Sequence, residues 1–442
     1  MTRPDWADAL PRNWIAKPLH AVADYTISSI DKHVVEGEEA VRLCNYSDVY
    51  KHDAIDLSLD FMAGTATKDE IRRFRLMADD VLITKDSESW DDIGVPALVR
   101  EAAHDLVCGY HLALIRPLGS SIAGSFLLRC LQALPIRLQL ELAANGVTRF
   151  GIPKAQIGAM LVPVPPLSIQ HAIADYLDRE TARIDALIAA KGRLLELLAE
   201  KRRTIITHAV TRGLDPSTTL KDSGVQWLGG VPEHWRLVPL RFLVKLVSGA
   251  TPNTATAEFW CGDIPWVSAK DMKCEEISDS EDHVEDAALA ATGLKMIPVG
   301  AVLIVVRGMI LAHSFPVAIT SKSVTINQDL KALLCHQLLD PRFLRDYLQG
   351  TEPSILALAD SSAHGTRKLE TDVLGRVPVF LPPIHEQIAI SKHLSAEKRM
   401  SHQIRAATEQ SIALLKERRA ALIAAAVIGQ LPVGAEAARS GC

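Results

Sequence analysis

The stretch Leu10-Pro-Arg-Asn-Trp-Ile-Ala-Lys-Pro-Leu19 decides the fold, because it recurs in related form as Val231-Pro-Glu-His-Trp-Arg-Leu-Val-Pro-Leu240. Trp14 and Trp235 are 221 residues apart. The segment 80–83 matches 301–304 at the same offset, and the Pro-Pro pair at 165–166 matches the pair at 382–383 at an offset of 217. So long a period indicates a duplicated domain and not a solenoid, whose repeats are about 20–50 residues.

The first part of each copy mixes short β-branched runs with helical stretches, which predicts an α/β domain. Expected strands are 41–43, 81–84 and 112–115 in the first copy, and 266–268, 302–306 and 331–334 in the second. Expected helices are 126–142 and 341–348. Thr148-Arg149 and Thr366-Arg367 are expected to occupy equivalent places, since each pair follows a glycine.

The second part of each copy is predicted to be one long helix. No proline occurs in 167–215 or in 384–431, and Pro-Pro precedes each stretch. Apolar residues recur at heptad-like steps in both, and Gly192 is a point where a bend is possible. Because an apolar stripe must be buried, an antiparallel pair is favoured over two domains joined by independent helical linkers.

Composition and motifs exclude several functions. The chain has 442 residues and a formal net charge of -5, so it lacks the overall basic character of many nucleic-acid-binding proteins, although a local patch is enough. No P-loop, G-x-G-x-x-G or G-x-S-x-G motif occurs, and no histidine spacing indicates a metal site. Seven scattered cysteines without a C-x-x-C pair, and an N-terminus without an apolar run, are typical of a cytoplasmic protein.

One fragment leaves open an alternative, a metal-dependent DNA endonuclease. Asp271-Met-Lys273, with Asp263 upstream, fits the D-x-K end of such a site, where carboxylates hold a divalent ion. The tripeptide is common, and the matching Asp48-Val-Tyr50 of the first copy lacks the lysine. The sequence therefore favours a chain without catalytic residues.

The combined motifs resemble the specificity subunit of type I restriction-modification systems. Ser223-Gly-Val-Gln-Trp-Leu-Gly229, followed by 231–235, is similar to the signature that opens a recognition domain in that family. Segments 81–92 and 266–272 are similar to the interior of such domains, and Pro382-Pro-Ile-His-Glu-Gln-Ile388 resembles the start of the family's helical spacer. The first copy departs from this pattern, with Pro166-Leu-Ser-Ile-Gln170 in place of the acidic-Gln pair.

The resemblance implies an α+β fold of two pseudo-symmetric α/β target recognition domains separated by two long antiparallel helices. It divides the chain into domain 1 (1–166), spacer helix 1 (167–215), a linker and domain 2 (216–383), spacer helix 2 (384–431) and a tail (432–442). Each domain is expected to read one half of a bipartite, non-palindromic site on double-stranded DNA. The helices are expected to set the spacing of the halves and to bind two modification subunits. S-adenosylmethionine, ATP and Mg²⁺ would be used by the modification and restriction subunits, with no cofactor in this chain.

Candidate DNA contacts are polar or basic residues in expected loops beside strand ends. They are Lys85, Ser87, Trp90, Thr148, Arg149, Lys270, Lys273, Arg307, Thr366, Arg367 and Lys368. For each position the alternative is a solvated turn.

Candidate partner contacts are apolar residues off the seam of the helix pair, which form a second apolar face. They are Leu195, Leu197, Ile206, Val210, Leu414, Ile423 and Val427. The alternatives are that these residues pack on the chain's own domains, or that the chain is a coiled-coil adaptor without sequence-selective DNA binding.

Overall fold

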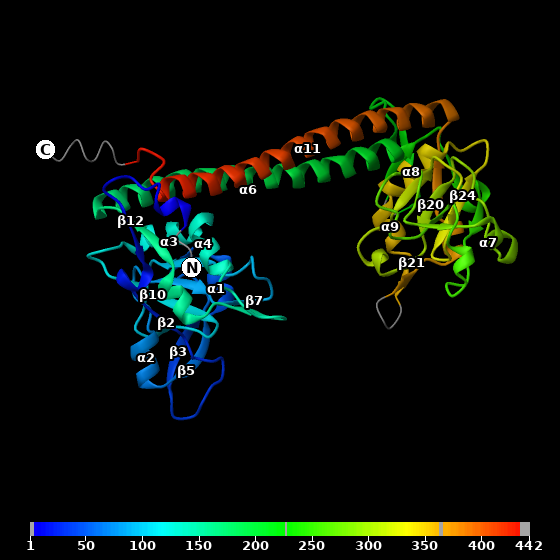
Figure 1. Cartoon of the computed structure of the whole chain (residues 1–442). Coiled ribbons are helices and arrows are strands. Elements are labelled where there is room, and N and C mark those ends of the chain that lie inside the picture. Colours follow the sequence, from blue (N-terminus) through cyan, green and yellow to red (C-terminus); the bar gives the residue numbers. More distant parts are fainter. Residues whose placement is uncertain (1–3, 226–227, 362–365, 434–442) are drawn as a thin grey trace. The chain divides into compact units, whose positions relative to one another are not determined.

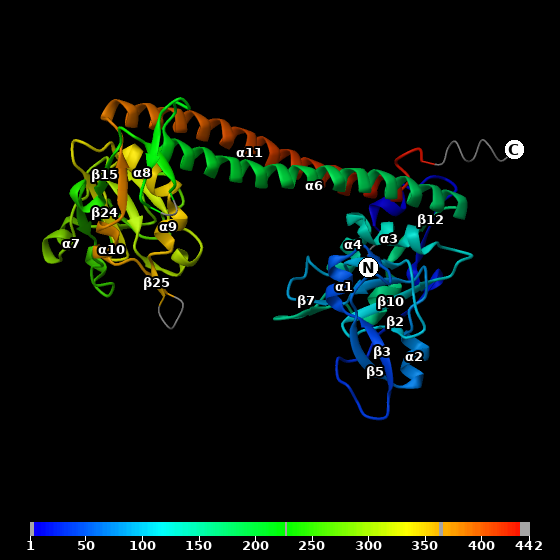
Figure 2. The same cartoon turned by 180° about the vertical axis from the view of Figure 1, so that it is seen from behind.

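The computed structural model describes residues 4–225, 228–361 and 366–433 (Figures 1 and 2). The chain divides into unit 1, Met1–Lys191 with Glu409–Cys442, and unit 2, Gly192–Thr408. Each unit contains one sheet-rich domain and one half of each long helix. This is the α+β class expected from the sequence. The boundaries between the two units fall within the two long helices.

The two domains repeat one sheet topology, as the duplication predicts. In unit 1 the central sheet has the order β2-β10-β6-β8-β4, and in unit 2 the order β16-β24-β20-β22-β18. The bounds in unit 1 are β2 Ala23–Ile27, β10 Leu112–Pro117, β6 Val81–Thr84, β8 Pro96–Val99 and β4 Ala54–Ile55. Those in unit 2 are β16 Val244–Ser248, β24 Leu330–Cys335, β20 Val302–Val305, β22 Val317–Thr320 and β18 Glu276–Ile277.

Smaller sheets also recur in both domains. Three strands form β5-β3-β9 (Met62–Ala66, Glu39–Cys44, Leu106–Cys108) and β19-β17-β23 (Asp282–Val284, Ile264–Val267, Thr325–Ile326). Two strands form β1-β12 (Ile15–Pro18, Leu161–Val164) and β15-β27 (Arg236–Pro239, Pro378–Leu381). An added hairpin, β13 Leu220–Asp222 with β14 Gly230–Pro232, precedes domain 2. The strands expected from sequence are all present within a few residues.

The short helices cover the sheets. In domain 1 they are α1 Tyr46–Lys51, α2 Lys68–Phe74, α3 Gly124–Gln132, α4 Leu134–Glu141 and α5 Lys154–Ala159. In domain 2 they are α7 Asp286–Ala291, α8 Pro341–Gly350, α9 Glu352–Leu356 and α10 Thr371–Gly375. The single helix expected over 126–142 is wrong, because the backbone of Ala133 is extended and Pro135 begins a second helix.

The long helices are α6 Leu167–Arg212 and α11 Ile384–Val427. The sequence predicted both starts, and both helices end a few residues earlier than expected. Gly192 does not interrupt α6. In unit 1 the N-terminal half of α6 accompanies the C-terminal half of α11, and in unit 2 the halves are reversed, so the helices are antiparallel. In both views they lie side by side within each unit (Figures 1 and 2).

Each long helix is followed by a glycine with a left-handed backbone, Gly213 with φ 79° and Gly429 with φ 74°. Trp235 packs beside Gly213 in unit 2, and Trp14 packs beside Gly429 in unit 1. The duplicated tryptophans therefore hold equivalent helix ends. No helix in the described ranges is long and apolar enough to span a bilayer.

Candidate nucleic-acid interface

In domain 1, two candidate segments that lie far apart in sequence form one small ribbon. Strand β7 (Asp86–Ser87) pairs antiparallel with β11 (Phe150–Gly151), with Phe150 opposite Ser87 and Gly151 opposite Asp86. We call this pair ribbon 1. It brings Lys85, Ser87 and Trp90 to the same place as Thr148 and Arg149.

Charges at ribbon 1 are largely paired. Lys85 Nζ donates to Asp86 Oδ1 at 2.7 Å, and His111 Nδ1 lies 2.7 Å from Asp86 Oδ2. Burial opposes ionisation of Asp86, but the hydrogen bonds to Lys85 and His111 outweigh it and lower the pKa of that carboxyl. The guanidinium of the exposed Arg149 lies 3.2 Å from His111 Nε2. Lys85 is thus held by its neighbour, and Arg149 is the more accessible cation.

Exposed aromatic side chains surround ribbon 1. Trp90 is 48% exposed, and Tyr50 and Tyr110 are also exposed. The Tyr50 ring stacks on Tyr46 with centroids 5.6 Å apart, and the ring of Tyr110 contacts that of His111. Ser87, by contrast, is buried. Trp90 could be predicted from the sequence, but the tyrosines could not, because they come from segments that only the tertiary fold brings to the ribbon.

Domain 2 contains the equivalent element, which we call ribbon 2. Strand β26 (Arg367–Lys368) pairs antiparallel with β21 (Arg307–Gly308) and with β25 (Asp360–Ser361). Ribbon 2 thus joins Arg307 to Thr366, Arg367 and Lys368. In Figures 1 and 2, β21 and β25 lie at the end of domain 2 away from α6 and α11.

The pairing in ribbon 2 determines which cations share a face. Arg307 lies opposite Lys368, so their side chains project on one face, and Arg367 projects on the other, opposite Gly308. Lys368 Nζ pairs with Glu370 at 2.6 Å. Neither Arg307 nor Arg367 has an ion pair within the described ranges. Two guanidiniums are therefore available for binding.

The ribbons correct the expected equivalence of Arg149 with Arg367. Phe150 opposite Ser87 corresponds to Arg367 opposite Gly308, and Ile152 N bonds Lys85 O as Leu369 N bonds Val306 O. Arg367 is therefore equivalent to Phe150, and Arg149 to Thr366. A shift of one residue matters because it moves a side chain to the opposite face of a strand.

Lys270 and Lys273 belong to neither ribbon. They lie in the turn after β17, where Lys270 Nζ pairs with Asp282 at 2.9 Å and with Glu281 at 3.2 Å. Hydrogen bonding to Asp282 raises the pKa of Lys270. Lys273 is exposed. Lys270 therefore fastens a turn, which leaves Lys273 as the freer cation.

The geometry gives no support to a nuclease site. Asp271 Oδ2 accepts hydrogen bonds from the backbone and hydroxyl of Ser268, and its Oδ1 accepts one from Glu281 N. Its carboxylate thus caps a turn. Over the described ranges, no three His, Cys, Asp or Glu side chains are arranged to hold a metal ion.

Four of the expected partner contacts are wrong. Ile206 and Val210 are buried in the core of unit 2, and Ile423 and Val427 in the core of unit 1. The chain's own domains cover them, which was the alternative reading. Leu195 is half-buried, and Leu197 and Leu414 are 61% and 56% exposed. Only these three remain as candidate partner contacts.

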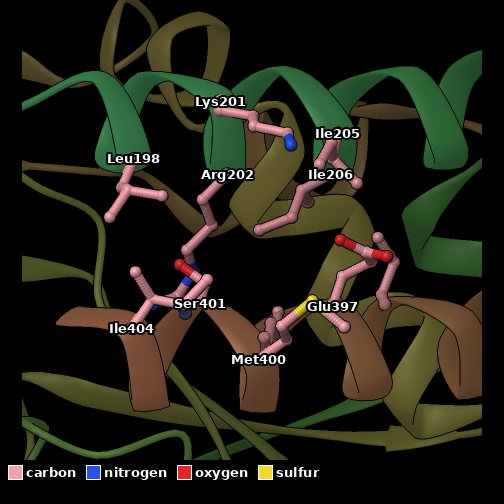
Figure 3. Close-up of a pocket in the computed structure, with 11 residues that line it drawn as sticks. Leu198, Lys201, Arg202, Ile205, Ile206, Glu397, Met400, Ser401 and Ile404 are labelled. Carbon is pink, nitrogen blue, oxygen red and sulfur yellow. The ribbon is translucent and has the colours of Figure 1, made fainter. Parts of the chain in front are cut away.

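In unit 2, the parts of α6 and α11 that lie side by side do not pack completely against each other. A cavity of about 60 Å³ lies between α6 and α11, lined mostly by apolar atoms. Ile205, Ile206, Met400 and Ile404 border it, with Lys201 and Glu397 at its polar parts (Figure 3). Met400 and Ile404 are also exposed. Apolar surface on the helix pair therefore remains uncovered by the described chain.

A duplicated glutamine attaches each long helix to its domain. Gln170 Oε1 accepts from Ala123 N at 2.9 Å, and its Nε2 donates to Ser121 O and Pro165 O. Gln387 Oε1 accepts from Asp340 N at 2.8 Å, and its Nε2 donates to Leu338 O and Pro382 O. Both glutamines lie in the motifs quoted from the sequence, but this role was not predicted. Their equal distance from Pro-Pro was the signal.

A partly buried ion pair reinforces each attachment: the base lies on the domain in unit 1 and on the long helix in unit 2. In unit 1, Arg129 on α3 bonds Asp178 on α6 at 2.6 Å. In unit 2, Asp346 on α8 bonds Lys398 on α11 at 2.8 Å. Burial opposes ionisation of Asp178, but the bonds from Arg129 and Arg100 lower its pKa. Each pair joins a helix of the domain to a long helix, so both pairs have a structural role.

Part of the chain matches a known protein family. Residues 232–413 match the family model described as the type I restriction modification DNA specificity domain. The EcoR124I/EcoR124II specificity subunit of Escherichia coli is 27% identical over 58% of this chain and 58% of that subunit. The chain thus spans 58% of the length of that relative. The putative MjaX specificity subunit of Methanocaldococcus jannaschii is 24% identical over 74% of both chains.

Solved structures share the fold. The HsdS subunit from Thermoanaerobacter tengcongensis matches with a TM-score of 0.55 and 18% identity, over 96% of this chain and 98% of that one. A chain from a study of complex assembly and conformational transition of the type I R-M system matches with a TM-score of 0.68 and 19% identity, over 96% and 99%.

Two copies of one sheet-rich domain, each fastened to a long helix, form a fold that these solved structures share. Residues 232–413 thus match a type I restriction modification DNA specificity domain, and the chain is similar in sequence to type I restriction enzyme specificity subunits, the family that its motifs resemble.

Proposed function

We propose that this chain is the non-catalytic, DNA-reading subunit of a type I restriction-modification complex. Ribbon 1 and ribbon 2 would each contact one half of a bipartite, non-palindromic site. The observation that carries this proposal is that separate candidate segments converge on the same small ribbon, in the same strand register, in both copies.

The chemistry of the ribbons suits base reading. A two-stranded ribbon fits the major groove of B-DNA, where arginine bonds the O6 and N7 of guanine. Arg307 and Arg367 are unpaired within the described ranges and lie on opposite faces of ribbon 2. Ribbon 1 differs, with Arg149 beside exposed aromatics. Because the ribbons differ in chemistry, the two half-sites are expected to differ in sequence.

The helices would perform the other tasks of such a subunit. We propose that α6 and α11 set the spacing of the half-sites and bind two modification subunits through exposed apolar residues that include Leu197 and Leu414. Those partners would use S-adenosylmethionine, and restriction subunits would use ATP and Mg²⁺, in the cytoplasm. This chain would hold none of these cofactors.

The test is DNA selection by the complete complex of this chain with its modification subunits. We expect wild type to enrich a two-part sequence from a random duplex library. Arg307→Ala with Arg367→Ala should relax one part and leave the other unchanged. The exposed Arg376, which lies outside ribbon 2, supplies the control Arg376→Ala.

Two results would contradict the proposal. A wild-type complex that selects no sequence would favour the coiled-coil adaptor. Cleavage of DNA by the chain alone with Mg²⁺ would favour the nuclease.

A further inference from the structure

A polar cavity of about 390 Å³ lies in unit 2, between the start of α8 and one face of α11. It is distinct from ribbon 2, which lies at the other end of the domain (Figures 1 and 2). It is also distinct from the apolar gap in Figure 3, since the two share no lining residue.

Basic side chains predominate around this cavity. Arg342, Lys392 and Arg399 line it and are exposed, and none of the three has an ion pair in the described ranges. Arg345 also lines it, although its guanidinium bonds Asp346 at 2.8 Å. Without a bound anion, these cations repel one another.

Two acidic residues share the lining, and one is already engaged. Asp340 Oδ1 accepts hydrogen bonds from the backbone of Arg342 and Phe343 and so caps α8. Glu276 is the other, and it is exposed. Because Asp346 offsets the charge of Arg345, three unpaired basic side chains face two acidic ones, and the cavity keeps an excess of positive charge.

A buried hydroxyl supplies an independent observation. Ser391 lines the cavity and is 3% exposed, and its Oγ has no hydrogen-bond partner among the residues that the structure describes. An unsatisfied buried hydroxyl is costly. Since the hydroxyl is a donor, an acceptor oxygen bound in the cavity would satisfy it.

The duplicated copy shows that the scaffold does not require these groups. Gln170 and Gln387 fix the register of the two copies at an offset of 217. At that offset Arg342, Ser391, Lys392 and Arg399 correspond to Ser125, Ala174, Asp175 and Ala182. Domain 1 is fastened to its helix without any of these basic residues. Their presence in domain 2 therefore has a cause other than attachment of the helix.

We propose that this cavity is a binding site for a phosphate-bearing anion. Guanidinium and ammonium groups around a donor hydroxyl match the several acceptor oxygens and the double charge of a phosphate group. The volume exceeds that of one phosphate, so a diphosphate fits. The phosphate can come from a free small molecule or from a nucleic-acid backbone. The site does not depend on base reading by the ribbons.

The test is isothermal titration of the full chain with pyrophosphate, in a buffer without phosphate or sulfate. We expect saturable binding at one site. Lys392→Ala with Arg399→Ala should weaken it at least about tenfold, because two charge-assisted hydrogen bonds are lost. Lys416→Ala with Arg418→Ala is the matched control, since both residues are exposed on α11 outside the cavity and their loss should leave binding unchanged. Ser391→Ala should weaken binding without removing charge.

A competition arm separates the sources. Displacement of pyrophosphate by a short DNA duplex identifies a backbone phosphate, and retention identifies a free small molecule; either supports the site. Absence of saturable binding to wild type overturns the proposal. Equal binding by the cavity variants and the control also overturns it. Circular dichroism spectra that match wild type ensure that these comparisons are made on folded chains.

Discussion

Replacing Gln387 with alanine should loosen α11 from domain 2 without changing ribbon 1 or ribbon 2. The side chain is fully buried and makes three hydrogen bonds of 2.8–2.9 Å, to Asp340, Leu338 and Pro382. Alanine leaves three backbone groups without that partner and opens a small cavity. Asp340 and Leu338, which supply two of these groups, are partly exposed, so water can partly replace the lost bonds. We therefore assign a loss of about 1 kcal/mol of stability to each hydrogen bond. The expected loss is about 3 kcal/mol.

Hydrogen exchange measured by mass spectrometry locates this loss. A local opening that is easier by about 3 kcal/mol should speed exchange about 100-fold over the first turns of α11. The first turns of α6 serve as a control in the same sample, because Gln170 makes the equivalent bonds there. Gln170→Ala should reverse the pattern. Gln403→Ala, at an exposed position of α11, should change neither helix start.

Two outcomes would refute this reasoning. Exchange accelerated less than about fivefold would mean that water replaces the bonds at little cost. Equal acceleration at both helix starts would mean that Gln387 acts on the fold as a whole and not on one attachment.

Four more outcomes are expected. Arg367→Ala should relax one base position of one half-site, at a cost of about 1–3 kcal/mol, and a uniform loss across sequences in a binding assay would instead indicate a phosphate contact. Four residues inserted near Lys191 should lengthen the recognised spacer, since the insert adds about 6 Å of helix; an unchanged methylation pattern contradicts this. Light scattering of a mixture with modification subunits should show a complex of one chain with two of those subunits. A chain that stays soluble and binds no modification subunit would contradict this stoichiometry. Because the pKa of Asp178 is lowered, its pairing stabilises the fold above about pH 4 and is lost as pH falls through the folded pKa. Asp178→Asn should therefore lower the melting temperature at pH 7, and the difference from wild type should shrink as pH falls below about 4.

The large elements could be predicted from sequence because local signals determine them. Pro-Pro pairs mark where α6 and α11 begin, and β-branched runs mark strands such as β6 and β20. Because the domain is duplicated, each element could be predicted twice, once from each copy. Pro135 was an unused local signal, and it divides the expected helix into α3 and α4.

The candidate site was less predictable because it depends on pairing between distant segments. Its basic residues could be found as loop residues, but Arg307 and Arg367 meet only through the register of β21 with β26. Matching Arg149 with Arg367 from sequence failed by one residue, which is the difference between two faces of a strand. Lys270 illustrates another limit, since Glu281 and Asp282 reach it only in the folded turn.

The helix surfaces show why periodicity alone misplaces an interface. An apolar position on a helix shows that something covers it and does not say what. Val210 and Val427 satisfied the pattern, yet the chain's own domains bury them completely. Leu197 and Leu414 satisfied it equally and remain exposed.

The position of ribbon 2 bears on how such a protein changes over generations. Arg307, Arg367 and Lys368 contribute nothing to the hydrophobic core of domain 2, whereas Leu369, which follows Lys368, is buried in it. Surface substitutions away from packing usually alter stability by less than about 0.5 kcal/mol. If ribbon 2 reads DNA as proposed, mutation at these three positions would therefore explore new DNA targets while Leu369 holds the strand in place. A subunit built in this way would acquire new sequence preferences without losing the ability to fold.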